Sequence, residues 1–156
     1  MPPFSASLGG LHPEAAPERG PLRFLVVDDD PYYAGYLGLL IRAGFGAHSE
    51  LDIAASVEEA LLRLNAADYD VCFLDYSLPP HTGMDVLRGM AGRRPDTVFI
   101  FATSNERRED IAEALREGAS NYLIKARISP YDLFKVVSEA RLQKRRDTSP
   151  QLALEG

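Results

Sequence analysis

Cysteine is nearly absent from this sequence of 156 residues, in which Cys72 is the only one. A single thiol forms no intramolecular disulfide and builds no thiolate zinc site, which fits a reducing compartment, so we expect a cytoplasmic protein. Basic residues are also scarce, since 17 Lys and Arg stand against 23 Asp and Glu and leave a net charge of −6. A protein of this charge repels nucleic acid and anionic lipid. We therefore expect neither a nucleic acid nor a membrane as partner.

Long apolar runs are missing as well. The longest, residues 22–27 and 37–41, fall far short of the roughly 20 residues that a membrane-spanning helix needs. Residues 1–21 contain no Lys or Arg before Arg19 and no continuous apolar stretch, so they do not form a secretory signal. Their glycine and proline content predicts a flexible arm. Residues 145–156 are polar and interrupted by proline, and they predict a tail.

Between these two segments, short apolar runs alternate with helical patterns. Strands are predicted at 22–27, 51–55, 70–75, 97–102 and 121–125. Helices are predicted at 31–42, 60–65, 83–90, 106–117 and 130–144. Asp30-Pro31 and Ser129-Pro130 each join an N-cap residue to a proline at the first helical position. The pair Ser56 and Glu59 forms a capping-box pattern.

This alternation predicts an α/β fold with a doubly wound parallel sheet of five strands. Strands that read as solid apolar runs are buried on both faces, and the helices between them supply the covering layers. A length of 156 residues with 46% hydrophobic residues suits one soluble domain, which we place at residues 22–144. Ligands of such sheets bind beyond the carboxyl ends of the strands. The strand ends are therefore the place to look for chemistry.

Polar side chains stand at four of the five predicted strand ends: Asp28 and Asp29 at the first, Asp75 at the third, Thr103 at the fourth and Lys125 at the fifth. Two carboxylates about 4 Å apart repel by about 4 kcal/mol at an effective dielectric constant near 20, so an empty cluster is strained. A divalent cation relieves this repulsion. A solvent-open site of oxygen ligands suits Mg²⁺, which keeps several waters, or Mn²⁺ in its place.

The same set of side chains predicts phosphoryl transfer. Asp75 stands alone at the end of a central strand and can act as a nucleophile, because carboxylates form acyl phosphates. Lys125 offers a positive charge to the phosphoryl oxygens, and Thr103 offers a hydroxyl donor. Charge neutralisation by the metal and by Lys125 then assists transfer onto Asp75.

Four segments carry a family resemblance across residues 22–144: LVVDDDP, VCFLDYSLPPHTG, FATSN and GASNYLIK. They resemble the receiver domain of two-component response regulators, including stand-alone, chemotaxis-regulator-like members. Pro79 and Gly83 follow Asp75 at the spacing of that family. The resemblance implies a flavodoxin-like sheet with strand order 2-1-3-4-5.

The resemblance also implies which residues hold the metal and which accepts the phosphoryl group. Asp28 and Asp29 are metal ligands by this comparison, with Asp29 the more direct one. Asp75 is a further ligand and the phosphoacceptor. The backbone carbonyl of Ser77 completes the implied ligand set.

Further roles follow from the resemblance for residues around the phosphoryl group. Thr103 and Lys125 bind its oxygens. Tyr122 is the aromatic switch residue, which turns inward as Thr103 moves. Ser77 and Asn105 occupy the positions where the family sets the rate of phosphate hydrolysis.

Two positions depart from the family pattern. The family usually has a proline directly after the lysine, in a cis peptide, and here Ala126 stands there. A cis bond before a non-proline residue costs about 2.5–4 kcal/mol, so the loop is either trans and reshaped or it retains strain. Thr82 stands where many members have an acidic residue, and we expect little effect from it.

The first predicted helix carries two apolar stripes. One comprises Tyr33, Leu37, Leu40 and Ile41. The other, about 100° away around the helix, comprises Tyr32, Tyr36 and Leu39. A broad buried face under the N-terminal arm is one interpretation, and we expect instead that the second stripe is a partner surface for the histidine-bearing helices of a kinase or phosphotransferase. Gly35 and Gly38 each cost about 1 kcal/mol relative to Ala in this helix, or they allow another group to approach closely.

The predicted function is a stand-alone phosphorylation switch without a turnover substrate. It accepts a phosphoryl group from a histidine kinase or histidine phosphotransferase and signals through protein contacts, because the two terminal segments leave no room for an effector domain. The sequence leaves open whether the protein forms a homodimer. One alternative is a receiver-like binding module that is never phosphorylated, for which Ala126 is the support. The other is an aspartate-nucleophile phosphatase, which generally needs an acidic residue where this chain has Ser77.

Overall fold

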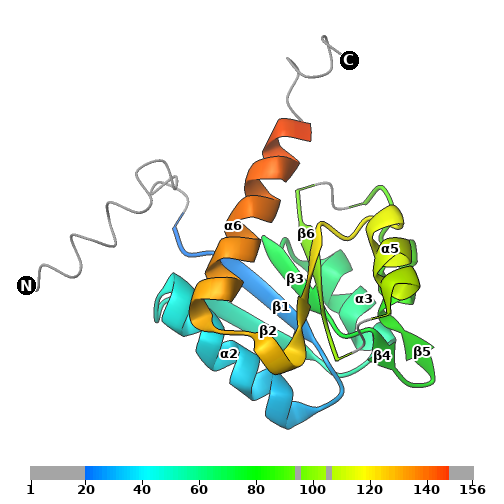
Figure 1. The fold of residues 1–156 in the computed structure, drawn as a ribbon, viewed down its shortest axis with the longest axis horizontal. Coiled ribbons are helices and arrows are strands. Elements are labelled where there is room, and N and C mark those ends of the chain that lie inside the picture. The colour runs from blue at the N-terminus through cyan, green and yellow to red at the C-terminus, as the bar shows by residue number, and fades with distance from the viewer. Residues whose placement is uncertain (1–19, 94–95, 105–106, 148–156) are drawn as a thin grey trace, which may run out of the picture.

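The computed structural model describes residues 20–93, 96–104 and 107–147, and both terminal segments predicted from the sequence lie largely outside these ranges (Figure 1). Its central sheet has five parallel strands in the order β2-β1-β3-β6-β7. The strands are β1 (Arg23–Val27), β2 (Glu50–Ala54), β3 (Val71–Leu74), β6 (Val98–Thr103) and β7 (Asn121–Ile124). In chain order this is 2-1-3-4-5, so the predicted fold class and strand order are confirmed.

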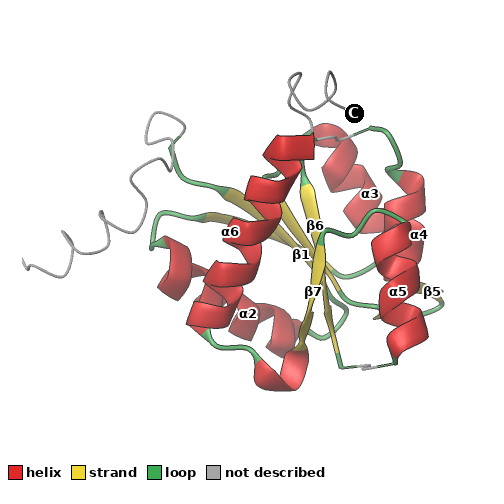
Figure 2. Cartoon of the chain, turned by 45° about the horizontal axis from the view of Figure 1, so that its top comes forward, coloured by secondary structure: helices red, strands yellow, loops and turns green. Residues whose placement is uncertain are grey.

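Helices cover both faces of the sheet, as the doubly wound architecture requires (Figure 2). The helices are α2 (Pro31–Phe45), α3 (Val57–Ala66), α4 (Gly83–Gly89), α5 (Arg108–Arg116) and α6 (Pro130–Asp147), with a 3₁₀ turn η2 (Lys125–Arg127) after β7. The helices α2 and α6 pack on one face, and α3, α4 and α5 pack on the other. No helix in the described part of the chain combines the length and the apolar character needed to cross a membrane.

Burial of β1 on both faces explains why it reads as a solid apolar run. Leu25 and Val27 belong to the core under α3 and α4, whereas Phe24 and Val26 belong to the core under α2 and α6. All four side chains are at most 1% exposed. Alternating residues of the same strand therefore fill two separate cores, and the layers on both sides fix the position of the strand ends.

Local capping signals place the helix starts where the sequence predicts them. Asp30 is the N-cap of α2, and its carboxylate accepts hydrogen bonds from the backbone N–H of Tyr32 and of Tyr33. Ser56 caps α3 by accepting from Glu59 N–H. The carboxyl ends of the helices differ more from the prediction. Helix α2 continues past the predicted Arg42 to Phe45, and α6 continues past 144 to Asp147.

The segment after β3 forms a hairpin where the sequence predicts only a loop. The strands β4 (Ser77–Leu78) and β5 (His81–Thr82) pair in antiparallel fashion around Pro79-Pro80. Leu78 anchors this hairpin in the core at 1% exposure. Thr82 caps α4 and forms a capping box with Asp85, so its hydroxyl has a structural role that the family comparison did not indicate.

The structure also decides between the two predicted forms of the loop after Lys125. Among the described residues the one cis peptide is Pro79-Pro80, so Lys125-Ala126 is trans. Residues Lys125–Arg127 form the 3₁₀ turn η2. The loop is therefore reshaped in the trans form.

Gly35 and Gly38 of α2 have different surroundings. A Cβ at Gly35 would meet nothing within 4 Å, whereas a Cβ at Gly38 would lie 2.7 Å from Leu51 Cδ2 of β2. We expect Gly35→Ala to raise the free energy of unfolding by about 0.5–1 kcal/mol, because alanine loses less backbone entropy in a helix. Urea denaturation measures this. Gly38→Ala is the matched control and should fall below Gly35→Ala in stability, and equal gains at both positions would contradict the packing at Gly38.

Candidate functional site

The register of the sheet brings two of the predicted strand ends side by side. Val27 of β1 pairs with Leu74 of β3, so the residues that follow, Asp28 and Asp75, emerge at the same edge. Backbone hydrogen bonds hold both main chains there: Asp28 N–H donates to Ala54 O at 3.0 Å, and Asp75 N–H donates to Val27 O at 2.9 Å. The sheet therefore fixes these carboxylates rather than leaving them on loose loops.

Three carboxylates converge at this edge. Asp28, Asp29 and Asp75 each place an oxygen within 4.8 Å of the others. Asp28 is 3% exposed and Asp75 is 9% exposed, whereas Asp29 is open to solvent. A set of hard oxygen donors with one open side fits Mg²⁺, which keeps part of its water shell. These residues thus fit the metal that the sequence predicts.

Lys125 reaches into the same cluster from the other side. Its Nζ donates to Asp28 Oδ2 at 2.6 Å and to Asp75 Oδ2 at 3.2 Å, with the lysine side chain 16% exposed. Burial lowers the pKa of Lys125, but its hydrogen bonds and charge interactions with Asp28 and Asp75 outweigh that effect and raise the pKa above its ordinary value. The ammonium therefore stays charged beside the two carboxylates.

Opposing effects act on the pKa of the Asp75 carboxyl group. Burial and the negative charge of Asp28 raise the pKa of Asp75 above its ordinary value. The charge and hydrogen bond of Lys125 and a hydrogen bond from the backbone of Ser77 lower it in part. A carboxylate that is more basic than usual is also the better nucleophile. A bound cation would stabilise the ionised form of this carboxylate.

The remaining predicted site residues lie around this cluster. Thr103 ends β6 and is 5% exposed, and it pairs in register with Ile124, directly before Lys125. Tyr122 pairs with Phe101 and is 38% exposed. Ser77 begins β4, and its hydroxyl-bearing side chain is exposed. The predicted tuning residue Asn105 lies outside the described residues.

Tyr33, which the sequence pattern placed only in an apolar stripe of the first helix, is also a member of the site. Its ring lies under the lysine ammonium, with Lys125 Nζ 4.4 Å from the ring centroid. Burial, together with the charges of Asp28 and Asp75 and the neighbouring Tyr36, raises the pKa of the Tyr33 phenol well above its ordinary value. The signal that could have indicated Tyr33 is its place in the first turn of the helix that directly follows Asp28 and Asp29.

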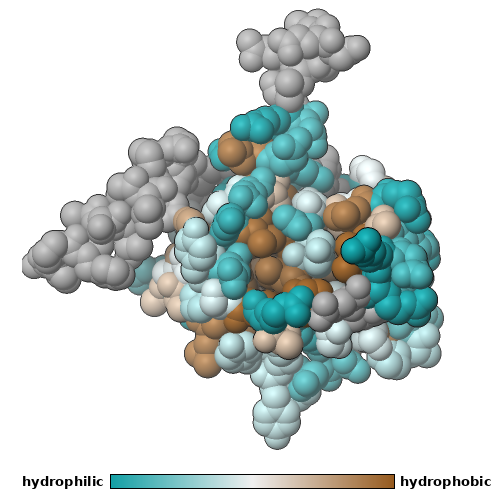
Figure 3. Space-filling view, viewed as in Figure 1, coloured by the Kyte–Doolittle hydropathy of each residue, from teal (hydrophilic) through white to brown (hydrophobic). Residues whose placement is uncertain are grey.

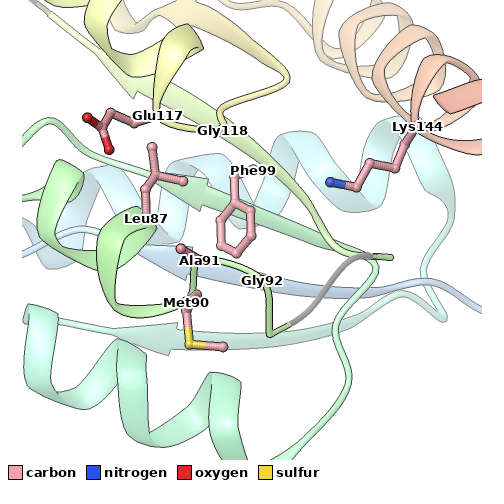
Figure 4. Close-up of a pocket in the computed structure, with 8 residues that line it drawn as sticks. All are labelled: Leu87, Met90, Ala91, Gly92, Phe99, Glu117, Gly118 and Lys144. Carbon is pink, nitrogen blue, oxygen red and sulfur yellow. The ribbon is translucent and has the colours of Figure 1, made fainter. Parts of the chain in front are cut away.

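A hollow of about 210 Å³ lies elsewhere, at the amino-terminal edge of the sheet. Figure 4 shows Leu87, Met90 and Phe99 in it, with Glu117 on one side and Lys144 on another. None of the predicted site residues lines it. The chemistry of the strand ends is therefore separate from this hollow.

The doubly wound α/β fold places an acidic cluster and a lysine together at the carboxyl ends of its strands. The family model described as the response regulator receiver domain matches residues 24–138. The chain belongs to this family, whose members act in two-component systems and whose receiver domains bind Mg²⁺ in an acidic pocket.

The chain is also similar in sequence to individual proteins. The chain is 38% identical over 105 residues to the DNA-binding transcriptional activator DevR/DosR of Mycobacterium tuberculosis, a match that covers 65% of this chain and 46% of that protein. The chain thus spans about half the length of this relative.

Solved structures share the fold. A CheY-like receiver domain protein from Methanospirillum hungatei superposes with a TM-score of 0.71 at 24% identity, covering 82% of this chain and 99% of that one. The CheX–CheY–BeF3–Mg²⁺ complex from Borrelia burgdorferi gives a TM-score of 0.69 at 20% identity, covering 76% of this chain and 88% of that one. At these identities the likeness concerns the fold.

Proposed function

We propose that this protein is a phosphorylation switch in which Asp75 accepts a phosphoryl group from the phosphohistidine of a histidine kinase or histidine phosphotransferase. The observation that carries this proposal is the Lys125 ammonium held between Asp28 and Asp75. An ammonium in that position faces the oxygens of a phosphoryl group on Asp75. The phosphorylated form then signals through protein contacts, without a turnover substrate beyond its own aspartyl phosphate.

The transfer step is a displacement at phosphorus. One carboxylate oxygen of Asp75 forms a bond to phosphorus as the bond from phosphorus to the donor's imidazole nitrogen breaks, and that bonding pair stays on the imidazole. Negative charge on the phosphoryl oxygens is met by the Lys125 ammonium and the Thr103 hydroxyl. Since Thr103 ends β6 and Lys125 directly follows β7, both groups need little rearrangement before transfer.

The proposed metal ligands are Asp28, Asp29, Asp75 and the backbone carbonyl of Ser77. Mg²⁺, or Mn²⁺, supplies positive charge for the phosphoryl oxygens when it is bound. The close approach of the three carboxylates supports this assignment, because their mutual repulsion is relieved by a cation.

The proposed signal begins at Thr103 and reaches the surface at Tyr122. A phosphoryl group on Asp75 attracts the Thr103 hydroxyl, and the movement of Thr103 allows the partly exposed Tyr122 ring to turn inward. The register of β6 and β7 supports this coupling, because Tyr122 pairs with Phe101, which lies two residues before Thr103 on the neighbouring strand. Ser77 and Asn105 are proposed to set how fast the phosphate is hydrolysed.

The proposed surface for the phosphodonor is the outer face of α2. Tyr32 is 88% exposed, Tyr36 46% and Leu39 68%, and Figure 3 shows a small hydrophobic group over the middle of α2 at the lower left. These side chains follow the Asp30 cap within about two and a half turns of α2. A helix docked on them therefore brings its histidine to the site.

Replacing both Tyr32 and Tyr36 with serine should slow phosphotransfer from the cognate donor by about tenfold, because burying aromatic side chains supplies much of the binding energy at such surfaces. Labelling by the small donor acetyl phosphate should fall by less than labelling by the kinase, because Tyr33, which contacts Tyr36, keeps its packing against the core beneath α2 and α6. Parallel time courses with radiolabelled kinase and with acetyl phosphate measure both rates. An equal loss with both donors would show that the tyrosines support the fold rather than docking.

Labelling at Asp75 tests the proposed function. The full chain incubated with acetyl phosphate and Mg²⁺ should gain one phosphoryl group, detected by intact-mass spectrometry. Asp75→Asn should show no labelling, and removal of Mg²⁺ with EDTA should slow labelling of the unaltered chain. Asp96→Asn changes an exposed carboxylate away from the cluster and is the matched control. Failure of the unaltered chain to label, or equal labelling of Asp75→Asn, would defeat the proposal and favour the binding-module alternative.

A further inference from the structure

The ring of Tyr33 and the ammonium of Lys125 form a contact between two segments far apart in the chain. Tyr33 lies in the first turn of α2, and Lys125 begins η2 after β7. The ring centroid is 4.4 Å from Nζ, a distance at which an aromatic face attracts a cation. None of the roles assigned so far includes this tyrosine.

The contact limits where the ammonium can go. Lys125 carries three N–H donors on a flexible four-carbon stem. Asp28 Oδ2 accepts at 2.6 Å and Asp75 Oδ2 accepts at 3.2 Å. The Tyr33 ring covers a further side of the same ammonium, so the lysine is held by three contacts rather than by the shorter ion pair alone. Without the ring, the ammonium keeps its shorter bond to Asp28 and is free to turn away from the oxygens of a group on Asp75.

Tyr33 is itself held in place by its neighbours. It packs at the border of the core beneath α2 and α6. Its ring also meets the ring of Tyr36 at 5.9 Å between centroids, with the planes 57° apart. These contacts fix the ring independently of Lys125, which is what a positioning group requires.

The phenol hydroxyl adds nothing to this support. Tyr33 Oη is buried and has no hydrogen-bond partner within the described residues. A buried hydroxyl without a partner is unfavourable. The aromatic ring, and not the hydroxyl, is therefore the part of Tyr33 that acts on Lys125.

We propose that Tyr33 is a positioning residue for phosphoryl transfer, whose ring holds the Lys125 ammonium against Asp75. The proposal rests on the proposed function of Asp75 as phosphoacceptor. It assigns the effect to the aromatic face, so Tyr33→Phe should retain it and Tyr33→Leu should lose it. The ring acts through Lys125 and touches no reacting atom.

The experiment measures the rate of labelling by acetyl phosphate and Mg²⁺ in the full chain. Tyr33→Leu should label about fivefold more slowly, the factor that corresponds to about 1 kcal/mol of ring–ammonium attraction. Tyr33→Phe should label at the unaltered rate. Tyr131→Leu, which changes a 70% exposed tyrosine on α6, is the matched control and should leave the rate unchanged. Thermal denaturation of each variant confirms that it is folded at the assay temperature.

Measuring the Tyr33→Leu change in the Lys125→Met variant distinguishes positioning of Lys125 from a general effect of Tyr33 on the structure. In Lys125→Met, measured at longer labelling times, Tyr33→Leu should cause no further loss, because the group on which the ring acts is gone. An equal fivefold loss with and without Lys125 would overturn the proposal, as would equal rates for Tyr33→Leu and the unaltered chain, or a loss in Tyr33→Phe as large as in Tyr33→Leu.

Nuclear magnetic resonance of the unphosphorylated protein tests the contact between Tyr33 and Lys125 separately from the proposed function of Asp75. The ring should slow exchange of the Lys125 ammonium protons with water, so their ¹H–¹⁵N signal should persist in Tyr33→Phe and vanish in Tyr33→Leu. If the unaltered chain does not label, the proposed function and the transfer role of Tyr33 fail together. If it labels and the Lys125 signal and rate are the same in Tyr33→Leu, the role of Tyr33 alone fails.

Discussion

Lys125→Met is expected to reduce labelling of Asp75 by acetyl phosphate by about 100-fold, the usual loss when one charge-stabilising donor is removed from a reacting group. The same change should lower the free energy of unfolding without Mg²⁺ by about 3 kcal/mol, because Asp28 and Asp75 lose a shared counter-charge. Both carboxylates are nearly buried, and Lys125 bonds to each of them. Radiolabelling and urea denaturation measure the two effects.

The two effects of Lys125→Met should respond differently to metal. Mg²⁺ should recover stability in Lys125→Met to a greater extent than in the unaltered chain, since the repulsion to be neutralised is larger. Labelling should stay slow, because the metal does not replace the ammonium. Lys135→Met, at an exposed position of α6, is the matched control and should change neither quantity. A near-normal labelling rate in Lys125→Met would remove the central support for the proposed function.

Gly83→Ala is expected to cost about 3 kcal/mol of stability, the upper end of the usual cost of overpacking. A Cβ at Gly83 would collide with the backbone carbonyl oxygen of Asp75. That carbonyl belongs to a strand end held by the sheet, so it cannot rotate away as a side chain can. Gly83 N–H also donates to Tyr76 O at 2.8 Å, which ties α4 to the residue after Asp75, the proposed phosphoacceptor. We therefore expect slower labelling of Asp75 together with the loss of stability.

Gly89→Ala is the matched control on the same helix. Its Cβ would lie 2.9 Å from Leu61 Cδ2, the far end of a flexible side chain that can move aside. The stability cost at Gly89 should therefore be smaller, and the labelling rate should be unchanged. Denaturation curves and labelling rates of the two variants decide the matter, and an equal cost at both positions would show that the approach of Gly83 to Asp75 is not special.

Local signals were sufficient for the five strands of the central sheet and for the starts of α2 and α3. Asp30-Pro31 predicts the start of α2, and the structure shows the carboxylate of Asp30 bonded to two backbone N–H groups of the first turn. The run from Phe24 to Val27 predicts a strand covered on both faces, and each of its side chains is buried. Such signals act between residues a few positions apart, so they can be recognised without the rest of the chain.

Other features depend on segments that meet only in the folded chain. The β4-β5 hairpin needs Leu78 to find the core, and the difference between Gly35 and Gly38 depends on where Leu51 of β2 lies. The outer stripe of α2 carries apolar residues in the sequence, but its exposure is decided by how α2 seats on the sheet. Pattern alone does not separate a partner surface from a second buried face.

The sequence by itself determined that carboxylates, a hydroxyl and a lysine stand at the carboxyl ends of parallel strands, because strand patterns and their end points are local properties. Only the tertiary structure decided how these groups meet. The ion pairs of Lys125 with Asp28 and Asp75 and the ring of Tyr33 under the ammonium join segments from three parts of the chain. Their positions follow from sheet register and helix packing, since distances of a few ångströms between remote residues are set by the whole core and not by any local pattern.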